Sequence, residues 1–297
     1  MNPLVSLIVQ GLANIVAADH DGEVKVSIDI STPKFLIEPL CHYHSAANMS
    51  LSNRVAIVTG AASGIGRCIA LRFAREGANI VIADIDLDGA KKIADEIRAL
   101  EREALPLKVD ISQHSQVQDM VRKTVEKFGR IDILVNNAGI VAPCAFLDST
   151  EEMWDQTMDV NLKGAYLCSK EVAPIMLNQK SGKIISISST AGLALPLALE
   201  NTPYAVSKTG VIGLTRSLAV NLGPYVNVNA ICPGFIEAGA SLRLNTPEFN
   251  AMQIKESLLK RSGKPEEIAS AALFLASNES DFITGEIITV SGGRGMR

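Results

Sequence analysis

Long hydrophobic runs are missing from this 297-residue sequence. No stretch reaches the 18 or more consecutive apolar residues that a membrane-spanning helix needs, so we expect no membrane association. An excess of positive charge is also missing, because the formal net charge is −4 and lysine and arginine form no dense cluster. Such a chain offers no broad positive field to nucleic acid or anionic lipid, and any phosphate must be recognised by local groups.

Paired cysteines are also absent from the sequence. The five cysteines are odd in number, widely spaced and without a C-x-x-C pair: Cys41, Cys68, Cys144, Cys168 and Cys232. This pattern argues against a zinc site and against a disulfide framework, and it favours a reduced, cytoplasmic setting. We therefore expect no metal ion.

Residues 1–18 place apolar residues at helical spacing, as a cleaved export signal does, but other features of residues 1–49 disfavour targeting. Residues 1–18 are uncharged and so lack the basic start of a secretory signal, and residues 1–48 contain five acidic residues but no arginine, unlike a mitochondrial presequence. A period-two alternation over residues 24–30 predicts a half-exposed strand. We interpret residues 1–49 as a retained extension of unknown role.

From Arg54 onward, short runs rich in valine and isoleucine alternate with longer segments of helical period. Apolar residues at consecutive positions are typical of strands buried on both faces, so the sequence predicts an α/β fold with a doubly wound, seven-stranded parallel sheet of the Rossmann type. Such sheets bind ligands beyond the carboxyl ends of their strands. The predicted strands are Val55–Thr59, Asn79–Asp84, Leu105–Asp110, Ile131–Asn136, Lys183–Ser189, Val226–Ile231 and Glu286–Val290.

A glycine-rich turn joins the first strand to a helical segment. Its three glycines, within Thr59–Gly66, allow a pyrophosphate to approach the free N–H groups at the helix start. A glycine-rich turn alone is weak support, since glycine serves in any tight turn. Eighteen residues beyond Gly66, the second strand ends in Asp84, whose carboxylate is placed to accept hydrogen bonds from ribose hydroxyls.

Tyr204 and Lys208 lie four residues apart, on one face of a predicted helix. A phenol has a pKa near 10, and a neighbouring ammonium lowers it. Tyr204 would then exchange a proton with an alcohol near neutral pH. The same spacing arises by chance in many helices, where a packed tyrosine and an exposed lysine are the ordinary outcome.

These motifs occur together, and residues 50–297 resemble a single-domain short-chain dehydrogenase/reductase. The T-G-x-x-x-G-x-G loop, the Asn136-Asn137-Ala138-Gly139 segment and Tyr204-x-x-x-Lys208 carry the resemblance. It implies a catalytic tetrad with direct hydride transfer between cofactor and substrate carbon. In this tetrad Ser189 polarises the substrate oxygen, Asn161 supports a water leading to the lysine, and the other members are Tyr204 and Lys208.

The resemblance also implies the cofactor groove. Asp110 would lie beside the adenine, and Pro233-Gly234 would face the nicotinamide. An acidic Asp84, with Ser63 where enzymes of this family that use NADP tend to carry a basic residue, favours NAD, since a 2′-phosphate is repelled. The groove residues are Gly60, Ser63, Gly64, Ile65, Gly66, Asp84, Asp110, Asn136, Ala138, Gly139, Tyr204, Lys208, Pro233, Gly234 and Ile236.

The sequence departs from the family pattern at three places. Ser189 and Tyr204 are slightly further apart than usual, so Leu193–Pro203 should shape the substrate pocket together with Ala238–Ser262. Ala238 stands where the family has a threonine that holds the carboxamide, with Ser241 as a substitute. The turn Leu222–Val226 looks short and should be tight.

Two functions follow. The leading hypothesis is an NAD-dependent enzyme that interconverts a secondary alcohol and a ketone. The alternative is a dinucleotide-sensing, non-catalytic binding protein on the same fold, which would be expected to lack the tyrosine or lysine. Sugars, hydroxyacyl thioesters, small diketones and polycyclic alcohols all stay open as substrates. The resemblance implies a homotetramer or homodimer, with helices around Leu162–Leu177 and Tyr204–Leu222 offering apolar faces.

Overall fold

The computed structural model describes residues 50–193, 201–238 and 246–294. The proposed extension 1–49 with its expected strand, Ser241, and most of the loop Leu193–Pro203 lie outside the described residues.

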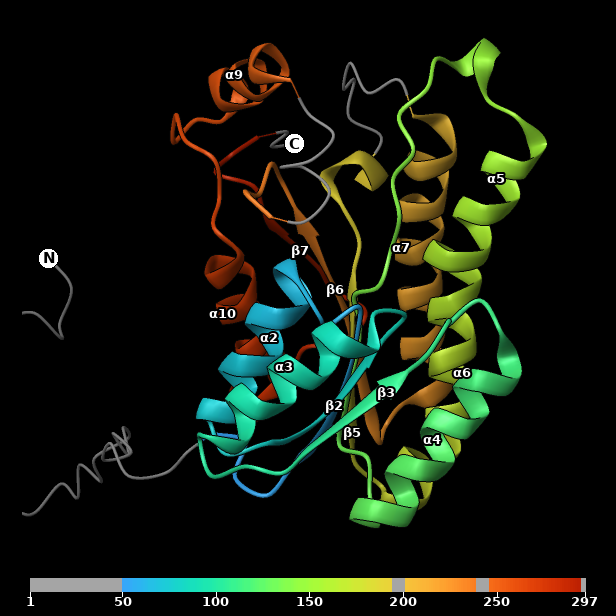
Figure 1. The fold of residues 1–297 in the computed structure, drawn as a ribbon, viewed down its shortest axis with the longest axis vertical. Coiled ribbons are helices and arrows are strands. Elements are labelled where there is room, and N and C mark those ends of the chain that lie inside the picture. The colour runs from blue at the N-terminus through green and yellow to red at the C-terminus, as the bar shows by residue number, and fades with distance from the viewer. Residues whose placement is uncertain (1–49, 194–200, 239–245, 295–297) are drawn as a thin grey trace, which may run out of the picture. The chain divides into compact units, whose positions relative to one another are not determined.

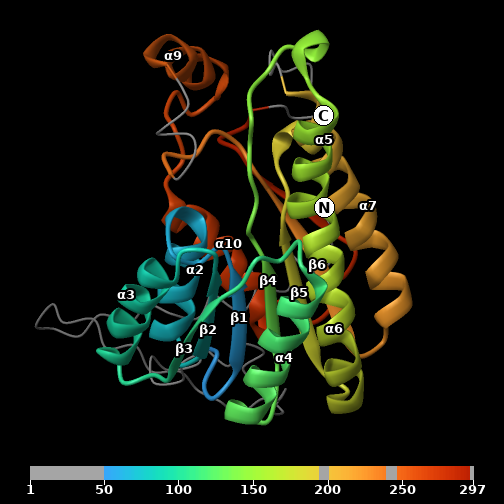
Figure 2. The same ribbon diagram turned by 45° about the vertical axis from the view of Figure 1, so that its right-hand side comes forward.

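A seven-stranded, wholly parallel sheet forms the centre of the domain (Figures 1 and 2). The strand order is β3-β2-β1-β4-β5-β6-β7. All seven strands expected from the sequence are present, with ends that shift by no more than two residues. They are β1 Val55–Thr59, β2 Asn79–Asp84, β3 Ala104–Lys108, β4 Ile133–Asn136, β5 Gly182–Ile187, β6 Val226–Pro233 and β7 Ile287–Val290.

Consecutive side chains of the central strands enter two different cores. In β1, Ala56 and Val58 join one apolar cluster whereas Ile57 joins the other, as the period-two geometry of a strand requires. Every residue of β1 and of β5 is buried. The edge strand β3 is only partly buried. This two-sided burial explains why the strands read as continuous apolar runs.

Helices cover both faces of the sheet, as Figures 1 and 2 show. One core holds α2 Gly64–Arg75, α3 Leu87–Arg98 and α10 Pro265–Ala276. The other holds α4 His114–Phe128, α6 Gly164–Gln179 and the end of α7 Thr202–Leu222. The remaining helical segments are η1 Phe146–Asp148, α5 Glu151–Met158, the π-helical turn η2 Asp159–Lys163, η3 Thr190–Leu193, α9 Pro247–Glu256 and η4 Asn278–Ser280.

The strand order reverses between β1 and β4. The chain proceeds outward from β1 to β2 and β3 and then returns to β4, so the loops after β1 and β4 open a crevice at their carboxyl ends. At the opposite end of the strands, α7 and β6 are joined by only three residues, Gly223–Tyr225, with a cis Gly223–Pro224 bond. No helix among the described residues is long and apolar enough to cross a membrane.

Candidate active site

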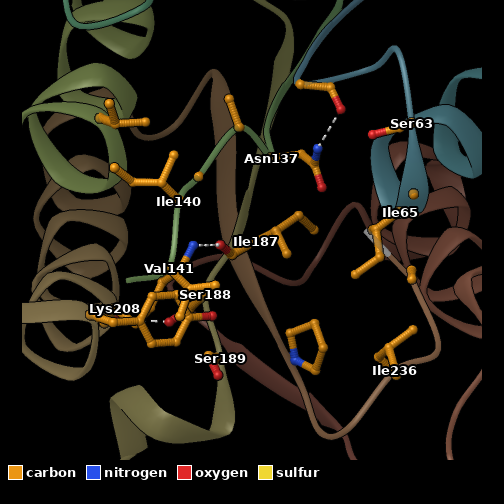
Figure 3. Close-up of a pocket in the computed structure, with 18 of the residues that line it drawn as sticks. Ser63, Ile65, Asn137, Ile140, Val141, Ile187, Ser188, Ser189, Lys208 and Ile236 are labelled. Carbon is orange, nitrogen blue, oxygen red and sulfur yellow. Dashed lines mark hydrogen bonds between the residues drawn. The ribbon is translucent and has the colours of Figure 1, made fainter. Parts of the chain in front are cut away.

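A cavity of about 1230 Å³ lies at this crevice (Figure 3). Fourteen of the residues predicted from the sequence line it, whereas Gly66, Asn136 and Asn161 do not. The lining residues among them are Gly60, Ser63, Gly64, Ile65, Asp84, Asp110, Ala138, Gly139, Ser189, Tyr204, Lys208, Pro233, Gly234 and Ile236. Residues from six different strand ends or the loops after them thus meet at one site.

The loop between β1 and α2 is shaped to hold an anion. Gly60 and Gly64 have φ values of +63° and +57°, in the left-handed region that favours glycine. Ser63 precedes the first turn of α2, and its side chain makes no capping hydrogen bond to that turn. The first N–H groups of a helix have no intrahelical acceptor, so they are available to a phosphate at the cavity wall.

Gly66 holds this loop together without lining the cavity. A Cβ at Gly66 would lie 2.2 Å from the carbonyl oxygen of Gly60 and 2.5 Å from Nδ2 of Asn137. The Asn137 amide in turn donates to the carbonyl oxygens of Thr59 and Gly60, at 2.9 and 3.0 Å. The third glycine of the motif therefore permits close packing between helix, loop and the segment after β4.

Gly66→Ala should therefore reduce dinucleotide affinity by at least about tenfold, because the loop must move to admit a methyl group, and overpacking costs roughly 1–3 kcal/mol. Titration of NADH by fluorescence measures the change in affinity, and thermal unfolding measures the loss of stability caused by overpacking. Gly213→Ala is the matched control, since nothing lies within 4 Å of a Cβ there and alanine is the better helix former. Equal NADH affinity in the two variants would contradict the packing role of Gly66.

Asn136 corrects one expectation, because its side chain points away from the cavity. It is 6% exposed, and Nδ2 donates to Ser169 Oγ of α6 at 3.0 Å. The next residue, Asn137, lines the cavity instead (Figure 3). Asn136 thus ties β4 to the helix beneath the sheet, and the expectation that it lines the groove was wrong.

Two carboxylates face the cavity after β2 and β3. Asp84 accepts from the Ala62 N–H at 2.9 Å and from the Asp86 N–H at 3.0 Å, one bond on each oxygen. Each carboxylate oxygen has two lone pairs, so Asp84 retains capacity for a ligand hydroxyl. Asp110 accepts from the backbone N–H and the hydroxyl of Ser112, at 3.0 and 2.7 Å.

Ser189, Tyr204 and Lys208 converge between β5 and α7. The Tyr204 phenol hydrogen bonds to the Ser189 side chain. Lys208 is 4% exposed, and its Nζ donates to the carbonyl oxygen of Ile187 at 2.8 Å and lies 5.7 Å from the centre of the Tyr204 ring. Figure 3 shows Ser188, Ser189 and Lys208 on this wall of the cavity.

The electrostatics of this group differ from the sequence-based expectation. Burial raises the pKa of Tyr204, a smaller lowering comes from its bond to Ser189, and proximity to Cys232 raises it further. Burial also lowers the pKa of Lys208 to about 8. The expected lowering of the phenol pKa by the lysine is therefore not met, since desolvation is the larger effect and Nζ is turned to Ile187.

Asn161 lies behind the cavity wall, in the π-helical turn between α5 and α6. It is 2% exposed. Its Oδ1 accepts from the Ile140 N–H at 2.8 Å, and its Nδ2 donates to the Ile140 carbonyl oxygen at 2.9 Å and to Ser207 Oγ at 3.1 Å. A Cβ on Gly139 would lie 3.2 Å from Asn161 Oδ1 and 3.4 Å from Lys208 Nζ. Asn161 thus fixes the backbone beside the lysine, which fits a supporting position.

Sequence reasoning missed several lining residues. Apart from Asn137, Arg294 after β7 was not expected, and four others were not singled out: Asn201, which lies within the loop Leu193–Pro203 expected to shape the pocket, and Thr246, Phe249 and Gln253 of the α9 region. The α9 residues fall within the segment expected to cover the substrate, and Ala238 of that segment also lines the cavity. No sequence signal points to Arg294.

Metal chemistry finds no support in the described part of the chain. There, no three residues of the types histidine, cysteine, aspartate and glutamate gather in a group that would hold an ion. The four described cysteines are free thiols.

Comparison with known proteins places the chain in context. Residues 60–294 match the protein family described as enoyl-(acyl carrier protein) reductase. BbsD, a subunit of the (2S)-[(R)-hydroxy(phenyl)methyl]succinyl-CoA dehydrogenase of Thauera aromatica, is 41% identical over 256 residues, covering 84% of this chain and 99% of BbsD. The 3-oxoacyl-[acyl-carrier-protein] reductase FabG of Thermotoga maritima is 40% identical over 247 residues, covering 82% and 99%.

Solved structures agree over the same region. A short-chain type dehydrogenase/reductase from Mycobacterium marinum has a TM-score of 0.81 at 34% identity, covering 84% of this chain and 98% of that one. A 7α-hydroxysteroid dehydrogenase in complex with NADH and 7-oxo glycochenodeoxycholic acid has a TM-score of 0.80 at 36% identity, covering 84% and 97%. With the fold, the glycine loop and the Ser189, Tyr204 and Lys208 group, these matches establish that the chain belongs to the short-chain dehydrogenase/reductase family of oxidoreductases.

Proposed function

We propose that this protein is an NAD(H)-dependent enzyme that interconverts a secondary alcohol and a ketone. The observation that carries the proposal is the convergence of Ser189, Tyr204 and Lys208 on the same cavity as the glycine loop, with the phenol bonded to the serine hydroxyl. A proton-transfer group and an oxygen-orienting group therefore lie beside a phosphate-binding loop.

The residues of the cavity fit a nicotinamide dinucleotide. The glycine loop lines the cavity through Gly60, Ser63 and Gly64 and leads into the N-terminus of α2, where free backbone N–H groups suit a pyrophosphate. Asp84 and Asp110 are acceptors for the adenosine part. We propose Gly139, Pro233, Gly234 and Ile236 as the wall at the nicotinamide. When bound, the dinucleotide supplies the hydride or accepts it.

The protein's own groups would then handle the proton and the substrate oxygen. In ketone reduction the Tyr204 hydroxyl donates a proton to the carbonyl oxygen, and in alcohol oxidation its phenolate accepts one. Ser189 hydrogen bonds to the same oxygen and orients it. Lys208 provides positive charge beside the phenolate and donors for ribose hydroxyls. Asn161 keeps the backbone at Ile140 in place and acts through position alone.

The preference for NAD over NADP should come from Asp84. Its carboxylate accepts hydrogen bonds from ribose hydroxyls and repels a 2′-phosphate. Asp84→Ser combined with Ser63→Arg should lower the ratio of kcat/KM for NAD to that for NADP by about tenfold or more, since a hydrogen bond to a charged group contributes roughly 1.5–3 kcal/mol. The steroid dehydrogenase that is similar to this chain was solved with NADH, which supports the assignment.

Absorbance of NADH or NADPH with a panel of alcohols and ketones measures this ratio. Asp88→Asn in α3, an exposed carboxylate whose ion-pair partner is Lys91, is the control for loss of charge alone. Equal kcat/KM for both cofactors in the unmodified protein would remove the NAD assignment. Tight NADH binding with no turnover across the panel would favour the non-catalytic dinucleotide sensor instead.

Three further assignments belong to this proposal. We place the enzyme domain at residues 50–297 and regard 1–49 as an extension, because the matches cover 99% of each named relative but only 84% and 82% of this chain. We propose a cytoplasmic location, which the free thiols of the described cysteines support. We propose a homodimer or homotetramer, supported by exposed apolar side chains on two helices: Tyr166 and Leu177 of α6, and Val206 and Val220 of α7.

A further inference from the structure

One part of the cavity wall plays no role in the proposed proton and hydride chemistry. It is formed by the start of α7, the α9 region and the segment after β7, and its polar side chains are Asn201, Thr246, Gln253 and Arg294. In Asn201 and Gln253 an amide nitrogen is buried and has no hydrogen-bond partner among the described residues. Nη2 of Arg294 is also buried without a hydrogen bond, but it pairs with Glu256 at 2.7 Å.

Gln253 presents the first unpartnered donor. The residue is 3% exposed, and its Oε1 accepts a hydrogen bond from Nη1 of Arg294. A guanidinium only donates hydrogen bonds, so the amide oxygen must face Arg294 and the orientation of the amide is fixed. Its Nε2 is buried and has no hydrogen-bond partner.

Asn201 presents the second unpartnered donor. The residue is 4% exposed and caps α7, where its Oδ1 accepts from the Tyr204 N–H at 3.3 Å. A backbone N–H is also only a donor, so this amide is fixed as well. Its Nδ2 is buried without a partner. This donor belongs to the turn that carries the Tyr204 phenol.

Two buried donors on one cavity call for an acceptor. Leaving a buried N–H group unpaired costs free energy, because its hydrogen bond to water is lost and none replaces it. Most buried polar groups in proteins are paired with another protein group, an ordered water or a ligand. Both groups are N–H donors, so the ligand group that satisfies them must present oxygen lone pairs.

The charge of this wall favours an anionic acceptor. Arg294 forms an ion pair with Glu256 through Nε at 2.8 Å and Nη2 at 2.7 Å, but the Glu256 side chain is 44% exposed whereas that of Arg294 is 6% exposed. Solvent therefore screens the carboxylate more than the guanidinium. Among the described residues that line the cavity, the carboxylates are Asp84 and Asp110, after β2 and β3, and the cations are Lys208 and Arg294.

We propose that the substrate carries a carboxylate, separate from the reacting carbon, which binds between the amides of Gln253 and Asn201 beside Arg294. A carboxylate has two oxygens and accepts without donating, which matches two N–H donors. Binding there fixes the distance between the carboxylate and the carbon that faces Tyr204. This inference rests on the proposed function and narrows its substrate to hydroxy acids and oxo acids.

The test uses matched probes that differ only in charge. The oxo acids 4-oxopentanoate, 5-oxohexanoate and 6-oxoheptanoate are compared with their primary carboxamides, by NADH absorbance and by calorimetric titration of the NADH-loaded full-length protein. At one chain length at least, the acid should have a kcat/KM and an affinity about tenfold or more above its carboxamide, as the loss of a charge-assisted hydrogen bond implies.

Two variants locate the effect. Gln253→Glu keeps an oxygen for Arg294 and replaces the free donor with a second carboxylate oxygen, and Asn201→Asp does the same while keeping the cap oxygen for Tyr204. Each should raise KM for the acid by about tenfold or more and change KM for the carboxamide by less than about threefold. Gln118→Glu, the same change at an exposed position of α4, should alter neither.

The outcomes separate this inference from the proposed reaction. Acid and carboxamide of equal affinity at every chain length, or a Gln253→Glu variant that weakens both alike, would overturn the carboxylate site. Reduction of neutral ketones without any preference for acids leaves the proposed reaction standing and removes the site. Selective binding of an acid that Gln253→Glu abolishes, with no probe reduced, supports the site and removes the reaction.

Discussion

Tyr204→Phe should lower turnover by at least the roughly 10²–10⁴-fold that general acid–base catalysis contributes, while folding and NADH binding persist. The phenylalanine ring fills the same space beside Lys208, and only the hydroxyl and its bond to Ser189 are lost. Ser189 keeps its other bond, which it accepts from the Ala191 N–H at 3.1 Å. The substitution therefore removes the proton-transfer group and little else.

Steady-state kinetics on any substrate that the parent converts measure turnover. NADH titration measures cofactor affinity, and thermal unfolding measures stability. Tyr225→Phe is the matched control, because Tyr225 lies 43% exposed in the turn between α7 and β6, at the other end of the sheet. Its turnover should equal that of the parent. Near-normal turnover in Tyr204→Phe would mean that the mechanism is wrong even though the family is right.

The pH dependence of the parent follows from the direction of the Tyr204 shift. Burial raises the pKa of the phenol, so it is protonated at pH 7 and ready to donate in ketone reduction. Alcohol oxidation needs the phenolate, and its rate should rise as pH increases toward that raised pKa. In Tyr204→Phe this rising limb should be absent.

The sheet was predictable because its strands carry their own signal. Continuous burial on both faces favours apolar residues at consecutive positions, and residues 55–58 of β1 and 80–83 of β2 form such runs without interruption. The glycine loop was predictable for a similar reason, since Gly60 and Gly64 adopt backbone angles that disfavour other residues. Both features are local, and local constraints leave traces in a sequence.

Which asparagine faces the cavity was not predicted, although the predicted strand Ile131–Asn136 and β4 end at the same residue. The strand continues through Asn136, so period-two alternation sends that side chain toward α6 and leaves Asn137 at the cavity. Every residue of β4 is buried, so its sequence shows no polar–apolar alternation that would tell which face Asn136 occupies. A shift of one residue exchanges the two roles.

The signs of the pKa shifts and the Gln253–Arg294 pair depend on tertiary burial. The spacing of Tyr204 and Lys208 indicates that the two side chains share a helix face, but it says nothing of how deeply both are desolvated. Arg294 reaches Gln253 only because the segment after β7 passes beside α9. Contacts between residues 41 apart in sequence have no local signature.

Lys208→Met should lower turnover about as much as Tyr204→Phe, and the double variant should lose little more than either single variant, since we propose that both residues serve the same step. Methionine has a similar length and suits a buried site. It removes the buried amine and the bond to the Ile187 carbonyl oxygen. Because the amine is buried, Lys208→Met should also change how the stability of the folded protein depends on pH, which a purely catalytic role would not require.

Burial lowers the pKa of Lys208 from its ordinary value of 10.5 to about 8, so the folded protein binds that proton less tightly than the unfolded chain does. Below pH 8 both states are protonated, and the folded state carries the full cost of a buried charge. Between pH 8 and 10.5 the unfolded chain binds more protons, so the stability of the parent should rise relative to Lys208→Met, by an amount on the order of 3 kcal/mol at about 1.4 kcal/mol per pKa unit.

Urea unfolding of parent and Lys208→Met at intervals from pH 7 to pH 10.5 measures this difference, in which groups common to both proteins cancel. Cys232 does not cancel fully, because the charge of Lys208 lowers the pKa of its thiol, and Cys232→Ser in both backgrounds removes that contribution. Lys91→Met, at an exposed position of α3, should show no such pH dependence. Should the parent and Lys208→Met keep a constant difference across this range while turnover collapses, Lys208 would be essential for catalysis but its burial would not lower its pKa, and desolvation would not govern the charge of the buried amine.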